Sequence, residues 1–384
     1  MRKTYLFIIY ILLFISVTGC MGDKDILKQR EEFSKASKVL TIGIPGPMAY
    51  MKEITGFYNG VMTAVEEINS RGGIEGREIN VIFEDDKGTF NDGIKIAQEF
   101  AHRKDIFAVI GHWNTYITLP AAEIYNDAGI VLLSPVVSNN ELTKKGYKYV
   151  FQNIINDSDM GSQIAQYVVE QGYKRLVVLY VENDYGKGLA KAFETSLTDT
   201  GATVIDRMTD FANEIEFNKS YNKWKALEYD AVFIADSMPH AGEFIKKLRQ
   251  KDSDIPIFSG DGLDVAELPS MLGKAANEIT IATMYNPGCG SLAQTEFIKQ
   301  YTKKYNLEPD LWAMQGYDSI KLLDYAFNNA KELTPSGVSQ ILKTKTGWEG
   351  IMGITEFNSE GQLTGRKVFW KRVQNGEMEY MTNQ

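Results

Sequence analysis

The stretch FAVIGHWNTYITLPAAEIYNDAGIVLLSP, residues 107–135, decides the fold. Its first apolar run, Phe107–Ile110, is typical of a buried strand. The segment Leu119–Asp127 is typical of a helix, and Ile130–Leu133 is a second apolar strand. A strand, a helix and a strand in this order indicate a parallel βαβ unit. Thr115, in the turn after the first strand, therefore lies at the edge where α/β sheets bind their ligands.

The same alternation continues along the chain in two halves. Besides the stretch above, strands are expected at 39–44 and 79–84 in the first half, and at 175–180, 203–206, 230–235 and 256–259 in the second. Helical patterns fill the intervals, which predicts two doubly wound α/β halves with one sheet each. From about residue 279 the pattern changes to helices at 295–305 and 311–329, a short helix after Pro335, and strands at 353–357 and 367–373. This tail is expected to pack onto both halves.

The first twenty residues, MRKTYLFIIYILLFISVTGC, have the pattern of an export signal. Basic residues precede the apolar run Tyr5–Val17, and small residues follow it, as in a secretory signal peptide. An uncleaved transmembrane anchor is the alternative, but the run is shorter than the ~20 apolar residues that a span needs. The position of Cys20 resembles a bacterial lipobox. The resemblance implies that residues 1–19 are removed and that Cys20 carries the lipid.

The next segment and the overall composition limit the partners. Residues 20–38 have few apolar side chains and many charges of both signs, so we expect a solvated tether, in which a short helix could form. The net charge of −9 argues against nucleic acid, which is bound by basic surfaces. Cys20 and Cys289 are the only cysteines, so a lipid on Cys20 leaves no intrachain disulfide.

Motifs for catalysis and for metal binding are absent from the sequence. It contains no G-x-S-x-G elbow, no P-loop and no H-E-x-x-H, and its three histidines lack the spacing of metal ligands. Cys289 lies in a Gly/Pro turn, where a small structural residue is a better explanation than a nucleophile. We therefore expect no enzyme activity, no cofactor and no metal.

Several motifs in a fixed order point to a known family. They are Asn59-Gly60 with Ile68-Asn69-x-x-Gly72-Gly73-Ile74-x-Gly76; Glu84-Asp85-Asp86; Val109-Ile110-Gly111-His112; Pro120-Ala121-Ala122; Ser134-Pro135 with Asn140-Glu141-Leu142-Thr143; Asn183-Asp184-Tyr185-Gly186-x-Gly188; and Gly316-Tyr317-Asp318. Each motif is weak alone, but the ordered set over residues 39–373 is specific. The chain resembles the type 1 periplasmic-binding-fold substrate-binding proteins, in particular the branched-chain amino-acid (Leu/Ile/Val) and amide group that serves ABC importers.

The resemblance implies a fold with a hinge. It predicts the type 1 periplasmic binding protein fold, in which two doubly wound Rossmann-like α/β lobes are joined by three crossovers, here near residues 155, 284 and 361. Lobe 1 then comprises residues 39–155 and 284–360, and lobe 2 comprises residues 156–283 and 361–384.

The resemblance also assigns ligand-binding residues. Thr115 and Ser138 would bind the ligand carboxylate, and the carbonyl of Val136 or Val137 would accept from the ammonium. Asp261 would pair with that ammonium, and an unpaired buried ammonium would indeed be costly. Each residue has an ordinary alternative: a helix cap for Thr115, a loop serine for Ser138 and a turn aspartate beside glycine for Asp261.

Aromatic residues complete the predicted site. Tyr185 falls where the family places an aromatic ring over the ligand; a packed surface tyrosine is the alternative. Trp113, Tyr50, Met51 and Tyr116 could surround the ligand side chain or belong to the core or the rim. Ser237 stands where leucine-binding members tend to carry tyrosine. This departure puts a branched aliphatic ligand in doubt and predicts a larger or more polar pocket.

The resemblance therefore implies a monomeric, lipid-anchored binding protein. It would lie on the outer face of the cell membrane or in the periplasm, and deliver a small solute such as an amino acid or amide to an ABC permease. Alternatives are a sensor that passes the ligand signal to a receptor, a ligand such as a urea-like compound or an aromatic acid, and an enzyme on the same fold.

Overall fold

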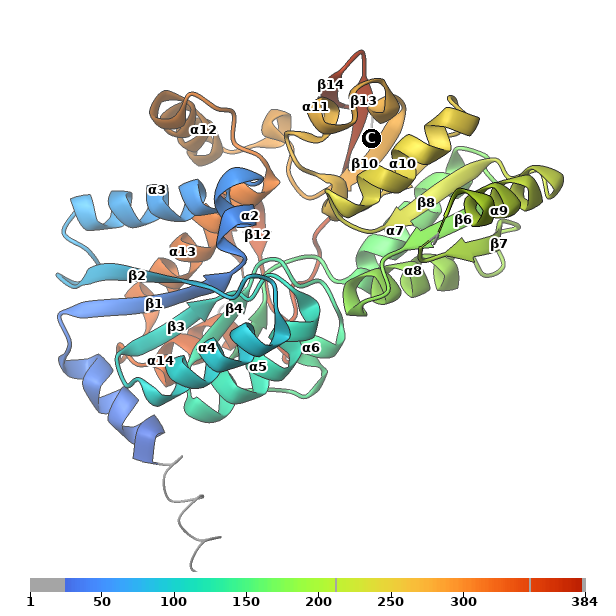
Figure 1. Ribbon diagram of the computed structural model, residues 1–384. Coiled ribbons are helices and arrows are strands. Elements are labelled where there is room, and N and C mark those ends of the chain that lie inside the picture. The colour runs from blue at the N-terminus through green and yellow to red at the C-terminus, as the bar shows by residue number, and fades with distance from the viewer. Residues whose placement is uncertain (1–24, 211–212, 345–346, 382–384) are drawn as a thin grey trace, which may run out of the picture.

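The computed structural model describes residues 25–210, 213–344 and 347–381 (Figure 1). The predicted signal peptide, residues 1–19, and the predicted lipid site, Cys20, lie outside the described residues. Within the described ranges, no helix combines the length and the apolar character that crossing a membrane requires.

Lobe 1 is built on a fully parallel sheet of strands in the order β2-β1-β3-β4-β5. The bounds are β1 Val39–Gly46, β2 Glu78–Asp85, β3 Ile106–Ile110, β4 Val131–Ser134 and β5 Val150–Gln152. Its helices are α2 Met48–Glu53, α3 Phe57–Ser70, α4 Phe90–His102, α5 Thr115–Ala128, α6 Glu141–Lys144, α12 Leu292–Tyr305, α13 Leu311–Asn329 and α14 Pro335–Thr344. A small antiparallel pair, β11 Trp348–Gly350 and β12 Gly353–Thr355, follows α14.

Lobe 2 is built on a sheet in the order β14-β13-β10-β9-β8-β6-β7. Five strands are parallel, and β13 and β14 add to them antiparallel. The strands are β6 Arg175–Tyr180, β7 Thr203–Met208, β8 Ala231–Ala235, β9 Ile257–Ser259, β10 Ile279–Thr283, β13 Phe369–Gln374 and β14 Glu377–Tyr380. The helices are α7 Asp157–Glu170, α8 Asp184–Ser196, α9 Glu214–Ala226, α10 His240–Lys251 and α11 Leu268–Leu272, with 3-10 turns η1 Asp261–Leu263, η2 Gly273–Ala276 and, after β10, η3 Pro287–Cys289.

The chain passes between the two sheets three times, after β5, after β10 and after β12. This confirms the predicted fold class of two doubly wound lobes joined by three crossovers. The residue limits given above for the lobes stay predictions. The strands β5, β10, β11 and β14 were not expected from the sequence.

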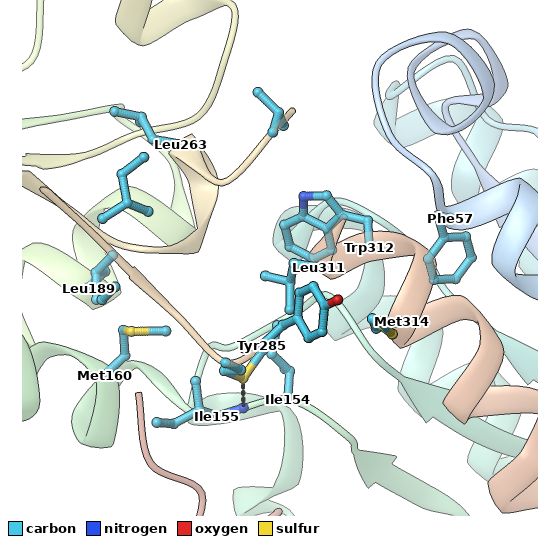
Figure 2. Packing of buried hydrophobic residues seen from close by; sticks show 14 of the residues in the cluster. Phe57, Ile154, Ile155, Met160, Leu189, Leu263, Tyr285, Leu311, Trp312 and Met314 are labelled. Carbon is cyan, nitrogen blue, oxygen red and sulfur yellow. Dashed lines mark hydrogen bonds between the residues drawn. The ribbon is translucent and has the colours of Figure 1, made fainter. Parts of the chain in front are cut away.

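Apolar side chains fill the junction between the lobes. One cluster of buried residues contains members of both sheets. Figure 2 shows Met160 and Leu189 of lobe 2 on one side and Phe57 of lobe 1 on the other, with Ile155 and Tyr285 of the crossovers between them. The N–H of Ile155 also points to the sulfur of Met284, at 3.3 Å, which joins the first crossover to the second.

Part of the predicted tether differs from the expectation of a solvated segment. Residues 25–36 are helical, and Arg30 and Ser34 in this helix are buried. The physical reason is that the Arg30 guanidinium is not solvated by water but donates to backbone carbonyls of lobe 1. In Figure 1 this helix lies beneath β1, at the end of lobe 1 that is remote from lobe 2.

Candidate ligand-binding cleft

A cleft lies where loops of the two lobes face each other. It is partly open to solvent. The lining residues are Tyr50, Trp113, Asn114, Thr115, Tyr116, Val136 and Trp312 from lobe 1, and Asn183, Tyr185, Ser237, Asp261 and Gly262 from lobe 2.

The strand ends explain why these residues meet. Trp113 and Thr115 follow β3, and Val136 follows β4; Ser237 follows β8 and Asp261 follows β9. Parallel strands direct their carboxyl ends to one edge of a sheet, and ligands of open α/β sheets bind outside that edge. The cleft therefore lies between two such edges, one from each lobe.

The lobe 1 side of the cleft offers donors for an anion. Thr115 is the first residue of α5 and is 5% exposed. The preceding Asn114 is extended and places no side-chain oxygen on the amides of the first turn. The N–H groups of Ile117 and Thr118 bond to the Asn114 carbonyl, at 3.1 and 2.9 Å. The N–H groups at the very start of a helix lack intrahelical partners and, with the helix dipole, favour a bound anion.

The lobe 2 side offers one carboxylate. Asp261 is 3% exposed and makes no ion pair with any described residue. Its Oδ1 accepts a hydrogen bond from the Tyr185 hydroxyl at 3.1 Å. Burial raises the pKa of Asp261 to about 6, although the bond from Tyr185 works against this rise. A carboxylate in this setting is suited to a cation supplied by a ligand.

An aromatic wall closes the lobe 1 side. The Trp113 ring packs against Tyr50 at 5.4 Å and against Trp312 at 5.1 Å between ring centroids. Asp310 fixes this arrangement, because its carboxylate accepts from Gly56 N–H at 3.0 Å and from Ala313 N–H at 2.7 Å. These bonds hold the start of α13, and hence Trp312, beside the turn between α2 and α3.

A buried polar network supports the loops behind this wall. His112 is fully buried, and its Nδ1 lies 2.9 Å from Oδ2 of Asp86. Its Nε2 lies 3.0 Å from the hydroxyl of Tyr125 in α5. The Asp86 carboxylate also accepts from Gly88 N–H at 2.9 Å. The network joins the loop after β2 to the loop after β3, which carries Thr115.

Most of the residues predicted from the sequence meet in this cleft, but three do not line it. Met51 is 2% exposed and belongs to the hydrophobic core, which was the alternative for this residue. Tyr50, Trp113, Thr115, Val136, Tyr185, Ser237 and Asp261 line the cleft, as does Tyr116. Val137 and Ser138 lie behind it: the Val137 carbonyl accepts from Gln152 Nε2 at 2.8 Å, and the Ser138 carbonyl accepts from Asp157 N–H at 2.8 Å. The ligand roles of all these residues stay predictions.

Four lining residues were missed. Asn114 and Gly262 adjoin predicted residues, and Asn183 belongs to the quoted motif around Tyr185, so closer attention to those loops would have found them. Trp312 carried no such signal, because it comes from a helix far along the chain.

Asp157 is a further buried carboxyl at the junction of the lobes. It begins α7, directly after the first crossover, and is 2% exposed. Burial raises its pKa to about 7, and the neighbouring charge of Asp261 adds to the rise. Among the described residues there is no cluster of three His, Cys, Asp or Glu side chains that could hold a metal ion.

Two α/β lobes with a cleft between the carboxyl ends of their sheets define the class of hinged solute-binding proteins. The sequence profile of the family described as periplasmic binding protein matches residues 42–377. The chain belongs to this family, whose members are solute-binding proteins, and membership implies that the protein is exported.

Individual relatives agree with this assignment. The Leu/Ile/Val-binding protein homolog 1 of Brucella abortus (strain 2308) is 28% identical over 356 residues, covering 90% of this chain and 94% of the relative. An ABC transporter substrate-binding protein from Desulfitobacterium hafniense, solved in complex with Leu, is 33% identical with a TM-score of 0.81, covering 89% and 100%. The branched-chain amino acid transporter substrate binding protein LivJ from Streptococcus pneumoniae, in complex with isoleucine, is 27% identical with a TM-score of 0.80, covering 89% and 99%.

Proposed function

We propose that this protein is an extracytoplasmic solute-binding lipoprotein that captures an amino acid between its lobes and delivers it to the permease of an ABC importer. The relatives named above, two of which were solved with Leu or isoleucine, support this class of ligand. The protein acts by binding rather than by catalysis, and as a monomer. Cys20 carries the lipid that holds it at the outer face of the membrane.

One observation carries the proposal: an unpaired carboxylate and an open helix N-terminus face the same cleft from opposite lobes. Asp261 belongs to lobe 2, and Thr115 with the first amides of α5 belongs to lobe 1. A zwitterionic amino acid matches both, because its ammonium pairs with Asp261 and its carboxylate accepts from the α5 amides and from Thr115. We also assign the ammonium a carbonyl from Val136, whereas a ligand role for Ser138, which does not line the cleft, stays a prediction of the sequence alone.

This division of contacts explains how binding closes the hinge. A ligand held by one lobe alone satisfies one of its two charges, and a buried charge without a partner is costly. The closed conformation, in which both lobes contact the ligand, is therefore stabilised by both charge interactions. The ligand shifts the population toward this conformation. The permease would then recognise this closed form.

The side chain of the ligand meets the aromatic wall and Ser237. The wall of Tyr50, Trp113 and Trp312 favours apolar or aromatic groups. Ser237 on the opposite lobe is small and has its N–H bonded to Asp236 at 2.7 Å. A side chain larger or more polar than leucine is therefore accommodated on the lobe 2 side.

Calorimetric titration tests the proposal on the protein without its lipid, residues 21–384. The panel comprises branched, aromatic, polar and basic amino acids, their α-amides, their deaminated acids and urea. We expect a micromolar or tighter amino-acid ligand, with binding lost when either the α-ammonium or the α-carboxylate is removed. A tight ligand that lacks an ammonium would overturn the role of Asp261, and turnover of a bound compound would overturn binding as the function.

A further inference from the structure

Lys371 is a buried cation in the sheet of lobe 2. It is the third residue of β13 and is 6% exposed. Its Nζ donates to Oδ1 of Asp264 at 2.7 Å, and Asp264 is 1% exposed. The other oxygen of this carboxylate, Oδ2, is buried and has no hydrogen-bond partner among the described residues. Because an isolated buried charge is costly, each member of this ion pair depends on the other.

Two tyrosine rings complete the surroundings of the Lys371 ammonium. The ring centroid of Tyr380 lies 4.9 Å from Nζ, and the ring centroid of Tyr285 lies 5.9 Å from it. Tyr380 lies directly opposite Lys371 in the antiparallel pair of β13 and β14, so the two side chains share one face of the sheet. Both distances suit cation–π contacts. The carboxylate and the two rings therefore restrict the lysine to one position.

Asp264 belongs to the segment that carries the proposed ammonium partner of the ligand. The turn η1 begins at Asp261, and Asp264 follows this turn directly. The Asp264 N–H donates to the Asp261 carbonyl at 2.9 Å. The strand register brings the lysine to this place, because Lys371 lies opposite Ile281 of β10, and Ile281 lies opposite Ser259 of β9. Figure 1 shows β13 beside β10 accordingly. A residue near the end of the chain thus holds the loop after β9.

The ion pair also affects the charge that surrounds Asp261. The ionisable side chains of the described residues that interact with its carboxylate are Asp264 from the same segment, Tyr185 of α8, Asp157 of α7 and Tyr50 of α2. Burial is the main reason why the pKa of Asp261 is raised, and the Asp264 carboxylate adds to the rise. The Lys371 ammonium, 2.7 Å from Asp264, offsets this like charge.

We propose that Lys371 is a positioning residue for the ligand ammonium: through Asp264 it fixes the turn that presents Asp261 and offsets the like charge beside it. β13 is the first strand after the third crossover, so the same ion pair attaches a segment next to the hinge to the ligand-binding turn. The inference rests on the proposed role of Asp261 in binding, but the link from Lys371 to Asp261 exists in the ligand-free protein.

Two substitutions at the ion pair should displace the Asp261 pKa in opposite directions. Lys371→Met leaves the Asp264 carboxylate uncompensated, so the Asp261 pKa should rise by at least about 0.5. Asp264→Asn removes the like charge and leaves the ammonium, so the Asp261 pKa should fall by a similar amount. Lys367→Met removes an exposed lysine that precedes the same strand, and it should leave the Asp261 pKa unchanged.

Carbon-13 NMR titration of the aspartate carboxyl groups measures these pKa values in ligand-free protein, residues 21–384. The Asp261 signal is assigned by its absence from the spectrum of Asp261→Asn. A general loosening of the turn would displace the pKa in the same direction in both ion-pair variants. Shifts of the same sign, or an unchanged Asp261 pKa in Asp264→Asn, would therefore overturn the proposal. If Lys371→Met failed to fold, the isosteric Asp264→Asn would carry the test alone, because its amide oxygen remains an acceptor for the lysine.

Calorimetric titration with the amino-acid ligand separates this inference from the proposed function. The midpoint of the pH profile of binding should follow the Asp261 pKa, upward in Lys371→Met and downward in Asp264→Asn. At pH 6, Lys371→Met should bind at least about twofold more weakly, because less of the carboxylate is ionised. Opposite NMR shifts without binding of any amino acid would support the link from Lys371 to Asp261 and overturn the proposed ligand. Ligand binding with the same midpoint in all variants would overturn the positioning role.

Discussion

The hydroxyl of Tyr185 lies 3.1 Å from Oδ1 of Asp261, and this bond joins the start of α8 to the turn after β9. Gly262 makes the close approach possible. A Cβ at this position would lie 2.4 Å from the Asp236 carbonyl oxygen and 2.8 Å from the Tyr185 hydroxyl. The carboxylate is consequently held by a neutral donor rather than by a cation. No cation of the described chain neutralises the carboxylate, so its charge is available to a ligand, while burial raises its pKa.

The first prediction concerns the pH dependence of ligand binding. Burial raises the pKa of Asp261 to about 6, and the ligand ammonium pairs with the ionised form. Affinity should therefore rise with pH through about 6 and level off above it. One unit below this pKa about a tenth of the protein has the carboxylate ionised, so the apparent Kd should be about tenfold weaker. Calorimetric titrations between pH 5 and 8 measure the profile, and a flat profile would contradict it.

The second prediction concerns the removal of this charge. Asp261→Ala should weaken binding of the amino-acid ligand by at least ~2 kcal/mol, or about thirtyfold, because the buried ammonium loses its counter-charge. The exposed Asp254 provides the control, and Asp254→Ala should bind normally. Unchanged calorimetric affinity in the Asp261 variant would remove Asp261 from the site.

The third prediction uses Gly262. Gly262→Ala introduces a Cβ that overlaps the Asp236 carbonyl and the Tyr185 hydroxyl. The turn must shift, so the bond from Tyr185 to Asp261 should lengthen or break and the Asp261 pKa should rise. We expect weaker binding at neutral pH and a midpoint of the pH profile displaced upward. Gly172→Ala is a control for glycine replacement, because nothing lies within 4 Å of its added Cβ, although its positive φ adds some strain. A pH midpoint identical to that of the unmodified protein would show that the turn absorbs the methyl group.

Residues that follow strands could be predicted from the sequence, and residues from remote segments could not. Thr115 and Asp261 each come directly after an apolar run, and parallel sheets bring such positions to one edge. Trp312 reaches the cleft because Asp310 bonds to Gly56, a contact between residues 254 positions apart. No local pattern encodes that pairing.

The packing of the helix at residues 25–36 against lobe 1 could not be predicted from the sequence, for a different reason. The many charges of this helix are typical of a solvated segment and predict a tether. Arg30 is buried because its donors meet carbonyls at the ends of α4, α5 and the start of β3, and backbone carbonyls leave no trace in the sequence. Strand β14 also lacks an apolar sequence pattern, because it is a short edge strand with two glutamates.

The fourth prediction concerns the network beneath the Thr115 loop. His112→Ala removes a partner from Asp86 and from Tyr125, both fully buried. The unfolding free energy should fall by about 3 kcal/mol, because a buried carboxylate is left with fewer partners. Denaturant unfolding measures the loss, with the exposed His102→Ala as control. A loss below about 1 kcal/mol would show that water or a local rearrangement replaces the histidine.

The fifth prediction concerns Asp157 and the stability of the hinge. Its folded-state pKa of about 7 is well above the ordinary aspartate value of 3.8, chiefly because of burial. A raised pKa means that the folded protein holds this proton more tightly than the unfolded chain does. The associated stability is complete below about pH 4 and is lost as the pH rises through 7.

Asp157→Asn should therefore be more stable than the unmodified protein at pH 8, and the difference should shrink as the pH falls toward 4. Thermal unfolding in the absence of ligand across this range measures it, with Asp254→Asn as the exposed control. The gain at pH 8 reflects removal of a buried charge whose ionisation is opposed by burial and by the neighbouring charge of Asp261. A stability difference that is independent of pH would mean that the Asp157 carboxyl does not titrate in this range.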